Sequence, residues 1–145
     1  MLIKQLSVFL ENRNGSMCEA LEILGRNDID IIALSLADTK DYGILRMIVS
    51  DPEKGRSVLR EQGLTASLTE VIAVRVAHAT GSLCKVMKML SDDEVNVEYM
   101  YAFANGEDAS AVMKIDDPVK AEEVLAKNRI KIWTAEEAYQ LNRMK

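Results

Sequence analysis

Hydrophobic residues occupy every second position in two separated segments of the chain. These positions are Leu6, Val8 and Leu10 and, further along, Ile72, Val74 and Val76. A period of two is typical of a β-strand with one buried face. Each segment leads through a glycine-containing turn to hydrophobic residues spaced i, i+3, i+4, i+7, which predicts a helix with one apolar side. The helical positions are Met17, Ala20, Leu21 and Leu24 in the first half and Leu83, Val86, Met87 and Leu90 in the second.

The two halves of the chain repeat each other without a gap at a shift of 66 residues. Identical residues fall at turns, helix starts and core positions. They include the pairs Gly15/Gly81, Ser16/Ser82, Cys18/Cys84, Leu24/Leu90, Met47/Met113, Asp51/Asp117 and Pro52/Pro118. An internal repeat of this kind decides the domain organisation before any other feature. The sequence therefore predicts one unit over residues 1–70 and a second over 71–145, which ends in a helical tail.

Each half continues with two further strands, a second helix and a short fourth strand. Asp51–Pro52 and Asp117–Pro118 are typical of a helix start, with Asp as the N-cap and Pro as the first helical residue. Ser16 and Glu19 fit a capping box at the start of the first helix. The order β-α-β-β-α-β predicts an α+β fold of two ferredoxin-like units, each with an antiparallel sheet and both helices on one face.

The charge balance narrows the choice of partners. The chain carries 18 basic and 23 acidic residues, a net charge of −5. This balance argues against nucleic acid or an anionic membrane as the main partner, because both require a basic surface. No apolar run approaches the ~20 residues that span a bilayer, and the chain opens with a strand pattern instead of a signal peptide. We therefore expect a soluble, cytoplasmic protein.

Few residues offer catalytic or metal-binding chemistry. Cys18 and Cys84 have no second ligand nearby at metal-binding spacing. We interpret them as small buried groups; the alternative is a thiolate activated by a helix N-terminus. His78 could act as a pH switch or a general base, but no nucleophile or carboxylate partner is evident near it. We expect no catalytic residue, metal or cofactor.

The loop between the first strand and the first helix is the candidate ligand site in each half. These loops comprise Asn12, Arg13, Asn14, Gly15, Ser16 and Met17, and His78, Ala79, Thr80, Gly81, Ser82 and Leu83. A helix start presents free N–H groups and the positive end of the helix dipole, which suits a carboxylate. Glycine also allows a ligand to approach the backbone closely. The alternative is a turn that requires glycine only for its φ angle.

This loop resembles that of the ACT domains, βαββαβ modules that bind amino acids and regulate enzymes of amino-acid metabolism. The loop pattern of that family is Asp or Asn, two residues, Gly, any residue, and then Leu. Asn12, Gly15 and Met17 follow the pattern in the first copy, with Met in place of Leu. In the second copy His78 replaces the acidic or amide residue. The resemblance covers residues 1 to about 134, and the chain is similar to stand-alone tandem ACT proteins.

The resemblance also implies where ligands lie. In this family two units lie side by side, with their second strands joined in one eight-stranded sheet and a ligand between the first loop of one unit and the second strand of the other. One such site would combine the loop at 12–17 with Tyr99, Met100 and Tyr101, and the other the loop at 78–83 with Ala33, Leu34 and Ser35. Asn12 would hold the ligand's ammonium group, and the N–H groups of Gly15, Ser16 and Met17 its carboxylate.

We predict a non-enzymatic regulatory protein that binds a free amino acid. The second candidate is a ligand-free regulatory or structural subunit that docks an enzyme of amino-acid metabolism through its bare sheet face, and a small hydrolase is third. We also expect a homodimer or larger oligomer that covers this face, because large exposed apolar patches are unusual on monomers. The apolar residues of the second strands are Ile32, Leu34, Leu36, Tyr99, Tyr101 and Phe103.

Overall fold

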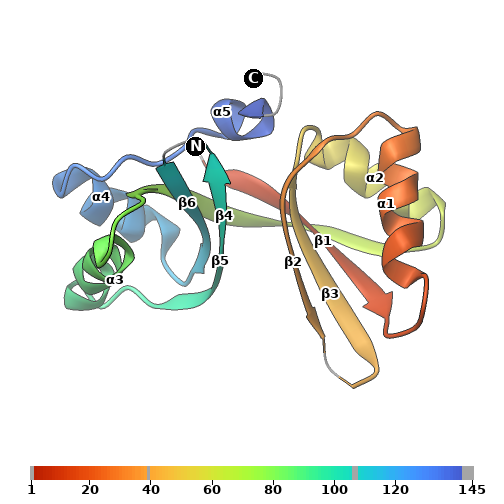
Figure 1. Ribbon diagram of the computed structural model, residues 1–145, viewed down its shortest axis with the longest axis horizontal. Helices are drawn as coiled ribbons and strands as arrows, with labels where there is room; N and C mark the ends of the chain where they lie inside the picture. Colours follow the sequence, from red (N-terminus) through yellow and green to blue (C-terminus); the bar gives the residue numbers. More distant parts are fainter. Residues whose placement is uncertain (1, 39, 106–107, 142–145) are drawn as a thin grey trace. The chain divides into compact units, whose positions relative to one another are not determined.

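The chain forms two compact units (Figure 1). The computed structural model describes residues 2–38, 40–105 and 108–141. The N-unit comprises Lys4–Thr69 with Glu136–Lys145, and the C-unit comprises Met1–Ile3 with Glu70–Ala135. These units differ from the sequence-based division, 1–70 and 71–145, at the ends of the chain, because the helical tail groups with the first repeat. Tyr139 illustrates this grouping, since its hydroxyl accepts a hydrogen bond from the backbone N–H of Lys4 at 2.8 Å.

The N-unit contains the elements expected of the first repeat. They are β1 (Ile3–Glu11), α1 (Ser16–Arg26), β2 (Ile31–Asp38), β3 (Tyr42–Val49), α2 (Pro52–Glu61) and the beginning of β4 (Thr65–Ala77), with the tail helix α5 (Ala135–Tyr139) added. Strand β3 pairs antiparallel with both β1 and β2, and Leu6 lies opposite Met47. Helices α1 and α2 pack over the face of the sheet that carries Leu6 and Met47.

The C-unit repeats this arrangement with a shorter closing strand. Its elements are the remainder of β4, α3 (Ser82–Asp92), β5 (Val97–Asn105), β6 (Asp108–Ile115) and α4 (Pro118–Lys127). Strand β6 pairs antiparallel with β4 and β5. The closing strand is reduced to a bridge between Val74 and Ile132, supported by a 2.8 Å hydrogen bond from the N–H of Trp133 to the carbonyl of Ala73.

The predicted fold class is confirmed. In each unit the strands pair antiparallel and both helices lie on one face, and the strand order of the described chain is β2-β3-β1-β4-β6-β5. The strand count is lower than the repeat suggests because β4 is unbroken: it serves as the fourth strand of the first repeat and the first strand of the second. The joining of the two second strands, implied by the family resemblance, stays a prediction.

The repeat extends to the details of the backbone. Among the described residues, those with positive φ form pairs separated by the repeat length: Gly15 with Gly81, Asp28 with Glu94, and Gly63 with Arg129. The left-handed region is unfavourable for residues with a side chain. Asp28, Glu94 and Arg129 nevertheless adopt it, so both copies hold the same turns whether or not glycine is present.

The helix starts agree with the prediction at α2 and α4 and differ from it at α1. Asp51 and Asp117 cap α2 and α4 as predicted, each accepting a hydrogen bond 3.1 Å long from a backbone N–H. The capping box at α1 is wrong, because Gly15 is the N-cap residue, at φ 91, and no side chain caps the helix. Ser16 already lies in the first turn, and its buried hydroxyl has no hydrogen-bond partner. Helix α3 likewise begins after Gly81, at φ 85, without a side-chain cap.

The cores of the two units use equivalent positions, with one large difference in size. The buried pairs include Leu6/Ile72, Val8/Val74, Leu24/Leu90, Met47/Met113 and Leu59/Leu125. Leu45 of β3, however, is replaced by Ala111 in β6. Leu34 and Leu36 of β2 lie opposite Met47 and Leu45, so they belong to the helix-covered face and not to the bare face that we expected them to help form.

Gly63 offers a test of the positive φ that follows α2. A Cβ atom at Gly63 would meet no atom within 4 Å, so Gly63→Ala adds backbone strain (φ 83) and no clash. We expect Gly63→Ala to lower the free energy of unfolding by about 1 kcal/mol in urea denaturation. Gly25→Ala is the matched control, because its Cβ is equally uncrowded but its backbone is helical; we expect a gain of about 0.5–1 kcal/mol. Equal stability of Gly63→Ala and the parent would contradict this account of the turn.

Candidate functional site

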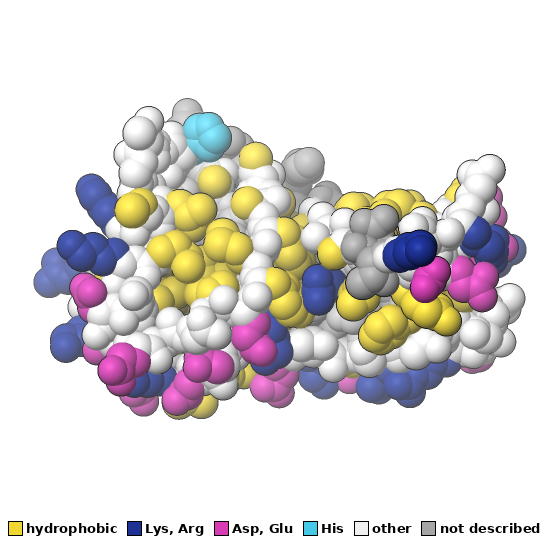
Figure 2. All heavy atoms as spheres, turned by 90° about the horizontal axis from the view of Figure 1, so that it is seen from below, with side chains coloured by type: hydrophobic (Ala, Val, Ile, Leu, Met, Phe, Trp, Pro, Cys, Tyr) yellow, Lys and Arg dark blue, Asp and Glu magenta, His cyan; other side chains and the backbone are white. Residues whose placement is uncertain are grey.

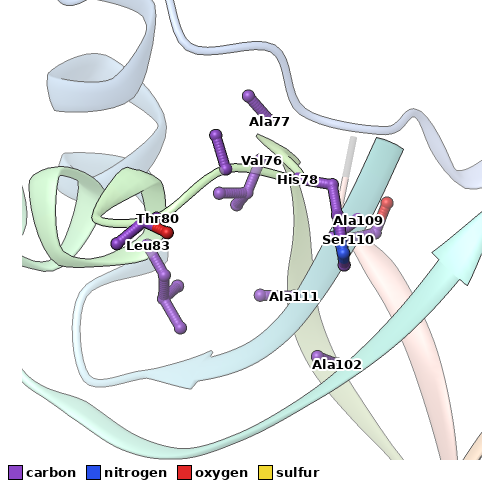
Figure 3. Close-up of a pocket in the computed structure, with 10 residues that line it drawn as sticks. Val76, Ala77, His78, Thr80, Leu83, Ala102, Ala109, Ser110 and Ala111 are labelled. Atoms are coloured by element: carbon purple, nitrogen blue, oxygen red, sulfur yellow. The ribbon is translucent and has the colours of Figure 1, made fainter. Parts of the chain in front are cut away.

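Each first loop lines a pocket within its own unit, at positions that the repeat makes equivalent. The C-unit pocket, of about 410 Å³, is lined by Val76, Ala77, His78, Ala79, Thr80, Leu83, Ala102, Ala109, Ser110 and Ala111 (Figure 3). The N-unit pocket, of about 80 Å³, is lined by Leu10, Glu11, Asn12, Arg13, Ser16, Met17, Leu36 and Gly43. Small-molecule sites usually measure roughly 300–1,000 Å³. Of these two pockets, the C-unit pocket falls within that range. The N-unit loop also borders a separate, more polar hollow of about 250 Å³ beside Arg13 and Glu19.

Side-chain size on the strands contributes to the difference between the pockets. Leu36 of β2 reaches over Gly43, where its Cδ1 atom would lie 3.3 Å from a Cβ placed on that glycine. In the C-unit the position of Leu36 is taken by Ala102 of β5, and that of Leu45 by Ala111 of β6. Two leucines that fill space in one unit are therefore methyl groups in the other.

The C-unit pocket lies between a helix start and the sheet. Figure 3 shows Leu83 extending from the start of α3 toward Ala111 and Ala102 on the strands, while His78 lies beside Ala109 and Ser110. In Figure 2 the protein's one histidine stands at the rim of a surface on which hydrophobic side chains gather. The pocket thus has an apolar interior, with polar groups at its edge.

The electrostatics of the two helix starts also differ. Both lack a side-chain cap, so their first N–H groups stay available to a ligand. Helix α1 carries Glu19 in its first turn, and Arg13 forms ion pairs with Glu19 at 2.9 Å and Glu11 at 3.2 Å. These contacts, the Glu19 hydrogen bond foremost, raise the pKa of Arg13 above its ordinary value. Helix α3 has no acidic residue in its first turn, and Lys85 stands at the position of Glu19. The start of α3 therefore suits an anionic group better.

Comparisons with known proteins agree with this architecture. The family described as the ACT domain pair matches residues 1–142. The chain belongs to this family. A search of curated proteins found no match.

Solved structures resemble this ACT pair over most of its length. Protein BT0572 from Bacteroides thetaiotaomicron is 38% identical, with 97% of each chain covered and a TM-score of 0.93. The regulatory subunit of aspartate kinase from Thermus thermophilus, in its ligand-free form, is 15% identical, with 87% of this chain and 93% of that chain covered and a TM-score of 0.63. The corresponding Thermus flavus subunit is 15% identical, with 87% and 90% covered and a TM-score of 0.62. At 15% identity the aspartate kinase subunits show a shared fold.

The structure gathers part of the predicted site of this ACT pair. Asn12, Arg13, Ser16 and Met17 line the N-unit pocket, and His78, Ala79, Thr80 and Leu83 line the C-unit pocket. Asn14, Gly15, Gly81 and Ser82 lie in the loops but do not line these two pockets. Neither do the predicted second-strand residues Ala33, Leu34, Ser35, Tyr99, Met100 and Tyr101, whose pairing with the loop of the other unit stays a prediction.

Sequence reasoning missed the strand side of the C-unit pocket. The residues concerned are Val76, Ala77, Ala102, Ala109, Ser110 and Ala111. A signal was present in the repeat, because aligning the two halves places Ala102 on Leu36 and Ala111 on Leu45. A loss of bulk at two positions of one repeat copy indicates a pocket only when both side chains are known to face the same space.

The cysteines lie on the solvent side of their helices. Cys18 and Cys84 are both exposed, so the predicted burial is wrong. Each follows an apolar residue of the helix stripe, and the next helical position points away from the sheet. The negative charge of Glu22 raises the pKa of Cys18, which disfavours its thiolate. Within residues 2–38, 40–105 and 108–141 no cluster of three or more His, Cys, Asp or Glu side chains could hold a metal ion. No helix in the described part of the chain is long and apolar enough to cross a membrane.

Asn12 is engaged in holding the first loop in place. Its side-chain amide donates to the carbonyl of Lys40 at 3.1 Å, and its backbone N–H donates to the carbonyl of Asp41 at 2.9 Å. We expect Asn12→Ala to lower the free energy of unfolding, without any ligand, by about 0.5–1.5 kcal/mol in urea denaturation. Asn14→Ala, two residues away and exposed, is the control and should change stability by less than about 0.5 kcal/mol. An equal effect of both substitutions would show that the Asn12 side chain does not tether the loop.

Proposed function

We propose that this ACT pair is a non-enzymatic regulatory protein that binds a free amino acid in the C-unit pocket. The observation that carries the proposal is a 410 Å³ pocket with an apolar interior that opens beside a helix start without a side-chain cap. An amino acid joins the two chemistries that such a site offers. Its carboxylate suits the N–H groups of the helix start, and its side chain fills the space over the strands.

The groups around the pocket mouth suit the rest of the ligand's backbone. Gly81, at φ 85, carries no Cβ, so a ligand can approach the turn closely. His78 lines the pocket at the position where the family pattern has an acidic or amide residue. A neutral imidazole can accept a hydrogen bond from an ammonium group through its unprotonated nitrogen. We assign this role to His78.

The N-unit pocket is a poorer candidate for the same ligand. Its volume is about 80 Å³, and Arg13 is paired with Glu11 and Glu19 at its edge. An incoming carboxylate would meet two carboxylate groups there. Of these two pockets, we therefore propose the C-unit pocket as the amino-acid site.

Ligand binding is tested by melting curves with each of the twenty amino acids. A ligand at ~100 times its dissociation constant stabilises the native state by about 2.7 kcal/mol, and each kcal/mol shifts the melting temperature by about 2–4 °C in a chain of this size. Gly81→Val should abolish the shift, because it places a branched side chain at the helix start. Gly15→Val is the matched control, since its φ of 91 imposes the same backbone strain in the other loop; its ligand response should remain. If no amino acid shifts the curve, the ligand-free docking subunit becomes the better interpretation.

We further propose that the protein forms a homodimer through the exposed apolar residues of the N-unit. Leu34 and Leu36 lie on the same face of the edge strand β2 and are 43% and 49% exposed. Exposed clusters of large apolar side chains are typical of interaction surfaces.

Light scattering coupled to size-exclusion chromatography at micromolar concentration tests the dimer. We expect twice the mass of the 145-residue chain, and the monomer mass for Leu34→Glu, which would bury a charge in the interface. Val119→Glu, at a residue 63% exposed in the C-unit, is the control and should stay dimeric. A monomer mass for the parent protein would contradict the proposal.

A further inference from the structure

The repeat supplies an internal comparison for the C-unit pocket. Equivalent positions line a pocket of about 80 Å³ in one unit and about 410 Å³ in the other. An equivalent loop, helix start and strand pairing surround both, and the loop residues Glu11 and Arg13 are replaced by Ala77 and Ala79. On the strand side, the exchange of Leu36 for Ala102 and of Leu45 for Ala111 removes the bulk that faces the helix start.

The added space is apolar in character. Ala111 is 2% exposed and lies opposite Ala102 in the pairing of β5 with β6. Val76 of β4 and Leu83 of α3 complete the interior. No Asp, Glu, Lys or Arg side chain lines this pocket. A charged ligand side chain would thus lose its water without gaining an ionic partner, which is strongly unfavourable.

We infer that the pocket selects amino acids with a large apolar or aromatic side chain, and that Ala102 and Ala111 are the specificity-determining residues. This inference rests on the proposed function and names the ligand class of the same site. The ligand's side chain occupies the volume that Leu36 and Leu45 fill in the N-unit. Small amino acids leave that volume empty, and acidic or basic ones place a charge in it.

The size of the preference follows from the area removed from water. Each additional buried methylene group strengthens binding about fourfold. Leucine, with three more carbons than alanine, should therefore bind about fifty-fold more tightly than alanine. Glutamate and lysine should bind more weakly than leucine despite their comparable length.

Titration calorimetry with leucine, phenylalanine, alanine, glutamate and lysine tests the selectivity on the full chain. Ala102→Leu restores the residue of the N-unit at an exposed position, so folding should be retained. We expect it to weaken leucine and phenylalanine binding at least about tenfold, and alanine binding by less than about threefold. Ala102→Val, a smaller step, should have an intermediate effect and serves if Ala102→Leu fails to fold.

Ala37→Leu is the matched control in the N-unit. It makes the same substitution at an exposed position of β2 that lines neither pocket, and it should leave the affinity of the C-unit site for leucine unchanged. Equal binding of leucine, alanine and glutamate, or an unchanged preference in both Ala102→Leu and Ala102→Val, would overturn the selectivity and leave amino-acid binding intact. Absence of binding for all twenty amino acids would instead overturn the proposed function itself.

Discussion

Both units depend on the packing of two helices against one face of the central strands. Leu6, Val8 and Met47 in the N-unit, and their equivalents in the C-unit, remove this face from water, which is the main favourable term in folding. The pairing of β3 or β6 with its neighbours sets which side chains share that face. Because these pairings are equivalent in the two units, each strand residue of one unit can be compared directly with the residue at the equivalent position of the other.

The same packing interaction explains how one copy can hold a pocket without losing its fold. Replacing a buried leucine by alanine usually costs about 2–5 kcal/mol when the space stays empty. Ala111 leaves such a space near the start of α3, where the pocket opens to solvent. The other buried pairs have side chains of similar size in the two units, so the loss of packing is confined to the region around Ala111. A ligand side chain in this space would restore the contacts that the leucines make in the N-unit.

The helix starts are of two kinds, those capped by a side chain and those without a side-chain cap. Asp51 and Asp117 close the starts of α2 and α4 with their own carboxylates, whereas α1 and α3 begin directly after a left-handed glycine and have no side-chain cap. The family pattern ranks the loop with Asn12 above the loop with His78. Pocket volume and charge favour the loop with His78 as the ligand site. The side-chain amide of Asn12 already donates a hydrogen bond to the carbonyl of Lys40, and carboxylates flank the start of α1.

The sequence alone determined the repeat, the order of elements, the Asp–Pro helix starts and most of the core, because each depends on local periodicity or on residues adjacent in the chain. The tertiary structure decided the features that combine distant residues. The uncapped start at Ser16 follows from the φ of Gly15, and the continuous β4 from pairings on both sides of Thr69. The larger pocket requires α3, β5 and β6 to bring Leu83, Ala102 and Ala111 together. Volume is a property of that whole arrangement, so no local pattern of residues could reveal it.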